Sequence, residues 1–150
     1  MKKNMRSYLL PVFVILLCFS CRSQVDMEEL KAELLTIHQN LIRAHLTNDP
    51  SLSVQTLSEN FASVKDGEIT FPDREEVLSG ITDYINNTTF TEYRDLQEPV
   101  IGLSEDGTVG WVISRVSVKG ARELNDSTKR EISFICSWMT LYRRVNGRWV

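Results

Sequence analysis

The chain has 150 residues, of which 42% are hydrophobic and 25% are charged, a composition typical of one globular domain with its own core. Its formal net charge of −3 excludes the broad basic surface that nucleic-acid-binding proteins need, so we expect no nucleic-acid partner. The short basic pairs Lys129–Arg130 and Arg143–Arg144 are typical of solvated strand ends and do not change that conclusion.

The beginning of the chain has the features of a signal peptide. Lys2, Lys3 and Arg6 form a positive region, and an apolar run from Tyr8 to Phe19 follows them. This run is too short for a comfortable membrane span but has the length of a signal sequence. The segment therefore predicts export from the cytoplasm.

The cysteine after this run resembles a lipidation site. Cys21 directly follows the small residue Ser20, as in a bacterial lipoprotein signal, although the two residues before Ser20 depart from the usual pattern. We expect residues 1–20 to be a signal peptide and residues 21–25 to be a tether from lipidated Cys21. The predicted location is the bacterial cell envelope, membrane-anchored; ordinary secretion and an uncleaved anchor are the alternatives.

The predicted domain, residues 26–150, begins with an amphipathic helix. Asp26 suits an N-cap, Glu29 completes a capping box, and apolar residues then recur at helical spacing to about Leu46. One face of this helix is therefore expected to be buried. Its apolar positions are Leu30, Leu34, Leu35, Ile37, Leu41, Ile42 and Leu46.

A short helical turn and a hairpin are predicted next. Asn48-Asp49-Pro50 ends the first helix and begins a second one that reaches about Leu57. Phe61 to Val64 is a predicted strand, Lys65 to Glu68 a turn, and Ile69 to Phe71 the partner strand.

The remainder is predicted to be one more helix and then strands. Pro72 and Asp73 open a helix that runs to about Asn86, and Gly120 to Ser127 is polar and predicted to be a loop. The predicted strands are Thr89–Leu96, Pro99–Leu103, Thr108–Lys119 and Thr128–Val145.

The last two long strands decide the expected fold class. Both are rich in β-branched and aromatic residues, and strands of this length need helices to cover one face. Asn146–Gly147 indicates a type I′ turn, because both turn positions need a positive φ, and Arg148 begins the return strand. The sequence thus predicts an α+β domain in which a curved antiparallel sheet holds the helices on its concave side.

Three segments carry a family resemblance: Asn48-Asp49-Pro50, Glu59 to Val64, and Leu141 to Trp149. With them, residues 27–150 resemble the nuclear-transport-factor-2-like superfamily, in particular its SnoaL-like and ketosteroid-isomerase-like members. The resemblance implies a cone-shaped fold with a pocket at the wide end. Family members usually continue past the tryptophan, so the end at Val150 predicts a stunted last strand, from a truncated sequence or a weakened domain.

The same resemblance implies where an isomerase would keep its chemistry. The carboxylate base would fall at Asp66, after the first strand, and the two oxyanion donors would fall near Leu41 and Met139. Neither leucine nor methionine can donate a hydrogen bond. Asp66 also precedes Gly67, a pattern typical of a turn, so the catalytic and the turn interpretations both stay open.

His38 and His45 are the only histidines, and both lie on the apolar side of the first predicted helix. Their spacing, roughly 10 Å along the axis, is too long for one metal ion held by two imidazoles. We expect no metal and no cofactor. Each histidine is either a satisfied, partly buried residue or a polar group that lines a ligand pocket.

Aromatic residues of the predicted strands are candidates for a cavity or a dimer face. Trp111 and Arg115 lie on one face of their strand, and Val112, Ser114 and Val116 lie on the other. Both faces are fairly apolar. One face should cover the helices and the other can pack on a second subunit. The candidates are Tyr93, Trp111, Arg115, Trp138 and Tyr142.

Three functions are compatible with these observations. The first is an envelope lipoprotein whose domain binds a small apolar or amphipathic molecule, or a partner protein, without catalysis, through His38, His45, Tyr93, Trp111 and Arg115. The second is an isomerase, cyclase or dehydratase with Asp66 or a histidine as base. The third is a dimerisation module, and a homodimer is expected in any case.

Cys136, the domain's only cysteine, is interpreted as a small buried hydrophobe rather than a nucleophile.

Overall fold

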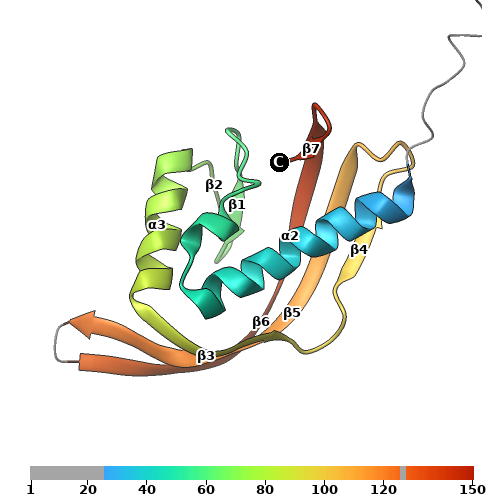
Figure 1. Ribbon diagram of the computed structural model, residues 1–150. Helices are drawn as coiled ribbons and strands as arrows, with labels where there is room; N and C mark the ends of the chain where they lie inside the picture. The colour runs from blue at the N-terminus through green and yellow to red at the C-terminus, as the bar shows by residue number, and fades with distance from the viewer. Residues whose placement is uncertain (1–25, 126–127) are drawn as a thin grey trace, which may run out of the picture.

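The computed structural model describes residues 26–125 and 128–150 (Figure 1). The expected signal peptide and Cys21 lie outside the described residues. The helical elements are α2 (Met27–Thr47), the 3-10 turn η1 (Pro50–Ser53) and α3 (Arg74–Asn86). The strands are β1 (Ser63–Lys65), β2 (Glu68–Thr70), β3 (Thr88–Asp95), β4 (Val100–Leu103), β5 (Val109–Asn125), β6 (Thr128–Val145) and β7 (Arg148–Trp149).

The helix α2 begins and ends where its capping residues predict. The Asp26 carboxylate accepts hydrogen bonds from the backbone N–H groups of Glu28 and Glu29, at 3.0 and 3.3 Å. Asn48 ends the helix in the left-handed conformation, with a φ of 56°. Between these ends Leu30 and Leu34 are buried, so the predicted apolar face is confirmed.

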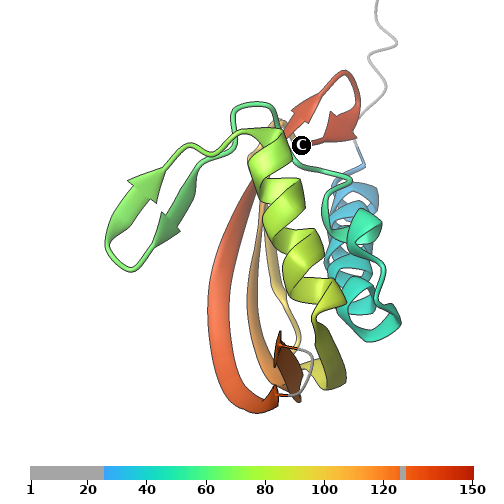
Figure 2. The ribbon, with the colours of Figure 1, turned by 90° about the vertical axis from the view of Figure 1, so that its left-hand side faces the viewer.

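The main sheet is antiparallel and curved, in the order β3-β5-β6-β7, with β4 also paired to β5. Both helices lie on its concave side, which Figure 2 shows from a second direction. The predicted α+β architecture is confirmed. In the described part of the chain, neither helix combines enough length and hydrophobicity to span a membrane.

Strand β5 is longer than the sequence indicates, and the loop predicted from Gly120 onward was wrong. Residues 120–125 continue the strand, because they pair with β6, for example Ala121 with Glu131. On the other side β3 approaches so closely that a Cβ at Gly120 would lie 2.3 Å from the carbonyl oxygen of Thr89. The glycine that suggested a loop is thus needed for strand packing.

The hairpin β1–β2 forms a separate two-stranded sheet that projects from the body of the domain (Figure 2). Asp66 and Gly67 have φ values of 53° and 86°, so the predicted turn is confirmed. The preceding 3-10 turn is shorter than predicted and stops at Ser53. The strand after it begins at Ser63, two residues later than predicted.

The second hairpin joins the end of β6 to the short strand β7. Asn146 and Gly147 have φ values of 51° and 78°, as the type I′ turn requires. The following strand β7 has two residues. Trp149 is buried, and its Nε1 donates a 2.8 Å hydrogen bond to the Glu33 carboxylate on α2, which ties the end of the sheet to the helix.

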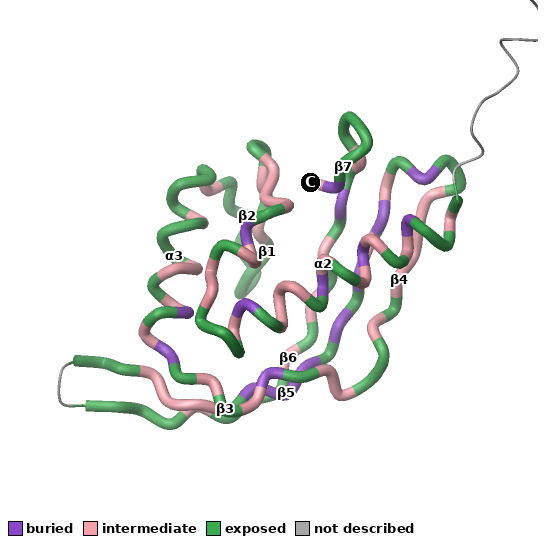
Figure 3. The backbone as a smooth tube through the Cα atoms, in the orientation of Figure 1, coloured by how far each residue is buried: buried purple, intermediate pink, exposed green. Residues whose placement is uncertain are grey.

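Two clusters of buried hydrophobic residues lie between α2 and the concave face. Figure 3 shows where the buried positions fall along the chain. The first cluster joins α2 to β5, β6 and β7; the second joins β3 and β5. Together they fix the helix against the sheet. The members are Leu30, Leu34, Val112, Tyr142 and Trp149 in the first, and Tyr93, Val116 and Val118 in the second.

Candidate functional site

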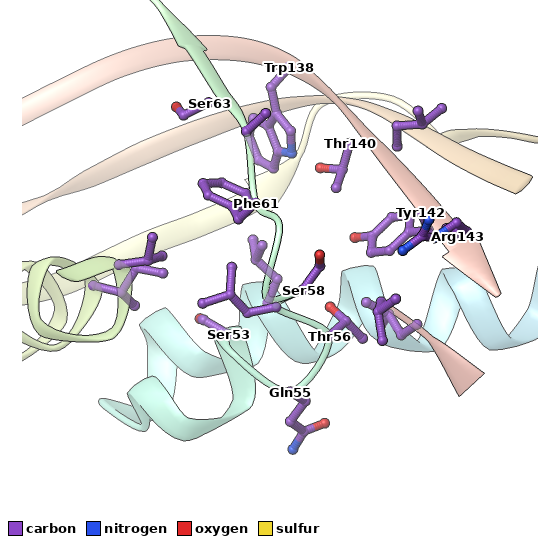
Figure 4. A pocket seen from close by; sticks show the side chains of 18 of the residues that line it. Ser53, Gln55, Thr56, Ser58, Phe61, Ser63, Trp138, Thr140, Tyr142 and Arg143 are labelled. Atoms are coloured by element: carbon purple, nitrogen blue, oxygen red, sulfur yellow. The ribbon is translucent and has the colours of Figure 1, made fainter. Parts of the chain in front are cut away.

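A pocket of about 680 Å³ lies between α2, the segment that follows η1, α3 and strand β6 (Figure 4). Ile37 and Leu41 reach it from α2, and Val77 and Ile81 reach it from α3. Residues 52–64 form one wall, which includes the start of β1. The volume falls within the range of small-molecule binding sites.

The pocket wall is mainly apolar, with a scatter of neutral polar groups. Among the described residues, no aspartate, glutamate or histidine lines it, and its charged residue is Arg143, at the β6 end. The larger apolar side chains are those of Ile37, Leu41, Leu52, Leu57, Phe61, Val77, Ile81 and Trp138. The hydroxyl and amide groups belong to Asn40, Ser53, Gln55, Thr56, Ser58, Asn60, Ser63, Thr140 and Tyr142.

Strand alternation places the β6 side of the site. Trp138, Thr140 and Tyr142 are two residues apart, so they share the concave face of the sheet. Burial raises the pKa of the Tyr142 phenol, and a hydrogen bond with the Thr140 hydroxyl acts in the opposite direction. The hydroxyl groups of Thr140 and Tyr142 can orient a ligand. Because the raised pKa keeps the Tyr142 phenol protonated, this group is a poor base.

His38 lies behind the pocket wall, in a buried hydrogen-bonded network. Its Nε2 is 2.9 and 3.0 Å from the two carboxylate oxygens of Asp95, and the Ser114 hydroxyl is 3.2 Å from its Nδ1. His38 is 3% exposed and Ser114 2%. Both ring nitrogens therefore have partners, and neither residue lines the pocket.

Trp138 lies against the ring of His38, with the centroids 6.3 Å apart, and also lines the pocket. Although serine, histidine and aspartate occur together here, Ser114 is buried and does not line the pocket. The network holds α2 against β3 and β5. It offers no nucleophile to a substrate in the pocket.

His45 is part of an aromatic cluster near the end of α2. Its Nδ1 donates to the carbonyl oxygen of Leu41 at 2.8 Å. Its ring stacks on Tyr93, with the centroids 4.0 Å apart, and meets the edges of Phe90 and Tyr84. Burial lowers the pKa of His45 and raises the pKa of Tyr93, so both groups favour their neutral forms.

The lowered pKa of His45 predicts a loss of stability in mild acid. The unfolded chain binds a proton at His45 near its ordinary pKa of 6.5, whereas the folded protein resists it, so the free energy of unfolding falls as pH drops below 6.5. We expect His45→Phe, which cannot titrate, to lose less stability between pH 7.5 and pH 5.5 than the unaltered protein. Urea unfolding at both pH values measures this, and equal losses would contradict it.

Comparisons with known proteins identify the fold. No family model matches the chain, and no curated protein sequence matches it. Among solved structures, an NTF2-like protein from Cytophaga hutchinsonii is 13% identical, with a TM-score of 0.59 over 83% of this chain and 92% of that one. A candidate dehydratase of the NTF2-like family from Streptomyces avermitilis is 12% identical, with a TM-score of 0.63 over the same shares of the two chains. The chain has the NTF2-like fold.

A candidate ketosteroid isomerase from Shewanella frigidimarina shares this fold at 15% identity, with a TM-score of 0.54 over 76% of this chain and 86% of that one. At such identities the likeness concerns the backbone, so the chemistry must be judged from this chain's own side chains. The resemblance inferred from the sequence is confirmed at the level of the fold.

The NTF2-like fold does not bring all the candidate residues together. His38 and His45 of α2 and Tyr93 of β3 do not line the pocket. Trp111 lies on the convex face, where it packs over Gly102, and Arg115 is exposed on the same face.

Asp66 is exposed at the tip of the projecting hairpin and does not line the pocket. Of the further aromatic candidates, Trp138 and Tyr142 do line it. Sequence reasoning missed the wall formed by residues 52–62, because this irregular segment has no periodic pattern.

Cys136 is half-buried and free, and burial raises the pKa of its thiol, which disfavours the reactive thiolate.

Within the described residues, no group of three histidine, cysteine, aspartate or glutamate side chains is arranged to hold a metal ion. The site of this NTF2-like domain is thus an apolar chamber with neutral polar groups and one cation at its rim. It can hold and orient a ligand, and its described residues include no acid–base pair.

Proposed function

We propose that this domain binds an apolar or amphipathic ligand in the pocket and does not catalyse a reaction by acid–base chemistry. The observation that carries the proposal is the pocket's lining: a large apolar wall with no aspartate, glutamate or histidine among the described residues. Such a wall binds apolar ligand groups because their burial removes them from water, and the hydroxyl groups of the wall can orient the ligand by hydrogen bonding.

The enzymatic alternative requires a base within hydrogen-bond reach of the bound substrate. Asp66 is at a hairpin tip, and neither His38 nor His45 lines the pocket. Leu41, at one of the places where the family resemblance implies an oxyanion donor, supplies only an apolar surface. The binding function therefore has the stronger support.

The shape of the lining favours an amphipathic ligand over a wholly apolar one. Thr140 and Tyr142 carry hydroxyl groups on the β6 side of the pocket, whereas Val77, Ile81 and Leu41 form its apolar part at the two helices. A ligand with an apolar body and a hydrogen-bonding end would place the body against the helices and the end near these hydroxyl groups.

Filling the pocket should abolish ligand binding. We expect steroid-like, polyketide-like or fatty-acid ligands to raise the melting temperature, because a ligand at one hundred times its Kd stabilises the folded state by about 2.7 kcal/mol. Thr140→Trp, which places an indole inside the pocket, should weaken the apparent ligand affinity at least tenfold and so reduce the rise in melting temperature. Differential scanning fluorimetry measures the shifts.

The matched control is Ser133→Trp, which adds the same side chain to β6 at an exposed position outside the pocket wall. Its ligand shifts should equal those of the unaltered protein. If no ligand class shifts the melting temperature of the folded protein, the pocket proposal is wrong.

We also propose that the domain is tethered in the cell envelope through lipidated Cys21, as the signal-like segment predicts. Cells grown with a labelled fatty acid should label the unaltered protein and not Cys21→Ser. Labelling that persists in Cys21→Ser would refute this site of attachment.

The homodimer also stays a prediction. It would form on the apolar convex face of the sheet, where Ile113 and Ile135 are exposed.

A further inference from the structure

A second pocket, of about 360 Å³, lies at the end of the β5–β6 ladder that is farther from β7. The end of α3, the end of β5 and the start of β6 form its wall. Figure 1 shows this region at the lower left, where the two long strands extend past β3 below α3. The wall is mainly polar, unlike that of the apolar pocket. Its residues are Asp83, Asn87, Arg122, Glu123, Leu124, Asn125 and Arg130.

Two arginines of this wall lie directly opposite each other on neighbouring strands. Arg122 of β5 pairs with Arg130 of β6, in a register that is regular up to Glu123. Residues opposite each other in an antiparallel ladder point to the same face, with their Cβ atoms about 5 Å apart. Like charges at such a distance repel, so this pair costs stability unless an anion lies between the two guanidinium groups.

The guanidinium group of Arg122 is held in place by α3. Its Nη2 donates to the Asp83 carboxylate at 3.3 Å, and its central carbon lies 5.5 Å from the centre of the Tyr84 ring. The side-chain amide of Asn87 donates a 2.7 Å hydrogen bond to the other oxygen of the same carboxylate. Arg122 is thus oriented before any ligand binds, while most of its N–H donors stay available.

The charges of this cluster do not cancel. Glu123 is paired with Lys129, whose Nζ is 2.7 Å from its carboxylate, and Asp83 is paired with Arg122. Within residues 26–125 and 128–150, Arg130 has neither an ion-pair nor a hydrogen-bond partner. One positive charge is therefore left over among the described groups, on a side chain that lines the pocket.

We propose that this second pocket binds a phosphate group between the guanidinium groups of Arg122 and Arg130. Each guanidinium group is planar and offers five N–H donors. A carboxylate has two oxygens in one plane and is matched by a single guanidinium group. A tetrahedral phosphate presents oxygens in several planes, so it can accept hydrogen bonds from two guanidinium groups on different strands. This site is separate from the apolar pocket, so the inference does not rest on the proposed function.

The size of the pocket restricts what carries the phosphate group. A volume of about 360 Å³ is near the lower end of small-molecule sites, which suits a small phosphate monoester. Leu124, which is 53% exposed, offers an apolar contact beside the arginines. The same phosphate chemistry occurs in soluble metabolites and in lipid headgroups, so the experiment needs an arm for each source.

Isothermal titration with glycerol 3-phosphate, at constant ionic strength, tests the site. We expect saturable binding, and Arg122→Gln or Arg130→Gln should weaken it at least tenfold, because each removes a charged hydrogen-bond donor. Arg115→Gln is the matched control, since Arg115 is exposed on the convex face of β5, outside both pocket walls. Its affinity should stay within threefold of the unaltered protein. Equal effects of all three variants would overturn the inference.

The repulsion between the two arginines gives a second readout, with the opposite sign. Without phosphate, Arg130→Gln should raise the melting temperature because it removes a like charge, and Arg130→Glu should raise it further because it can pair with Arg122. Both variants should lose the additional rise that glycerol 3-phosphate produces in the unaltered protein. A fall in the melting temperature of Arg130→Glu without phosphate would contradict the inference, because the two arginines would then not repel each other.

Further probes separate the sources of the ligand. Binding of glycerol 3-phosphate, without sedimentation on phosphatidylcholine vesicles that contain phosphatidic acid, assigns the site to soluble phosphate monoesters. Sedimentation that needs both phosphatidic acid and Arg130 assigns it to a lipid headgroup. If succinate binds as tightly as glycerol 3-phosphate, the assignment to phosphate is wrong. If neither glycerol 3-phosphate nor the vesicles bind, the inference is wrong, and the proposal for the apolar pocket is unaffected.

Discussion

Replacing Leu34 with alanine is expected to lower the free energy of unfolding by about 3–4 kcal/mol, within the range of buried leucine truncations. Leu34 is 0% exposed and lies in the cluster that joins α2 to β5, β6 and β7. Its Cδ1 is 2.6 Å from the place where Gly110 would carry a Cβ, so the leucine fills the space that the glycine leaves. The loss combines transfer to water with the cavity that remains.

Urea unfolding followed by far-UV circular dichroism measures this effect. Leu46→Ala is the matched control, because Leu46 belongs to the same helix and is 50% exposed. The control should change the free energy of unfolding by less than about 1 kcal/mol. Equal losses for the two variants would mean that α2 is not held by the cluster around Leu34.

Removing the carboxylate of Asp95 is expected to cost about 1–3 kcal/mol, because it leaves Nε2 of the buried His38 ring without a partner. Asp95→Asn keeps an acceptor oxygen and should cost less. Glu98→Ala, in the exposed segment after the same strand, should have little effect. Thermal and urea unfolding give all three values.

A double-mutant cycle with His38→Leu and Asp95→Ala isolates the interaction between the two residues. We expect a coupling free energy of about 1–2 kcal/mol, within the range seen for residues in one hydrogen-bond network. A coupling close to zero would show that the contact does not stabilise the fold. Ligand affinity of Asp95→Asn should stay unchanged, since neither residue of the pair lines the pocket.

The local elements were predictable because their signals are local. Asp26 caps α2 through its own neighbours, and Asn146–Gly147 adopts the positive φ values that its turn requires. Residues 120–125 were mistaken for a loop because their polar character reflects exposure. Their strand conformation is imposed by pairing with β6, which no local pattern reveals.

The candidate site was predictable only in part. Trp138 and Tyr142 were among the aromatic candidates, and their alternation places both on the concave face. Trp111 and Arg115 could not be assigned to a face, since both sides of β5 carry apolar residues. The partners of His38 are 57 and 76 positions away along the chain, so its role depends on contacts that sequence spacing does not show.

Caps, turns, the apolar stripe of α2 and the strand composition were enough to establish an α+β domain with helices on a curved sheet, because each depends on residues close together in the chain. The position of the pocket and the buried contacts of His38 with Asp95 and Ser114 depend instead on which distant segments meet. Those contacts arise only when the sheet curves over α2, since burial and strand pairing are properties of the assembled fold.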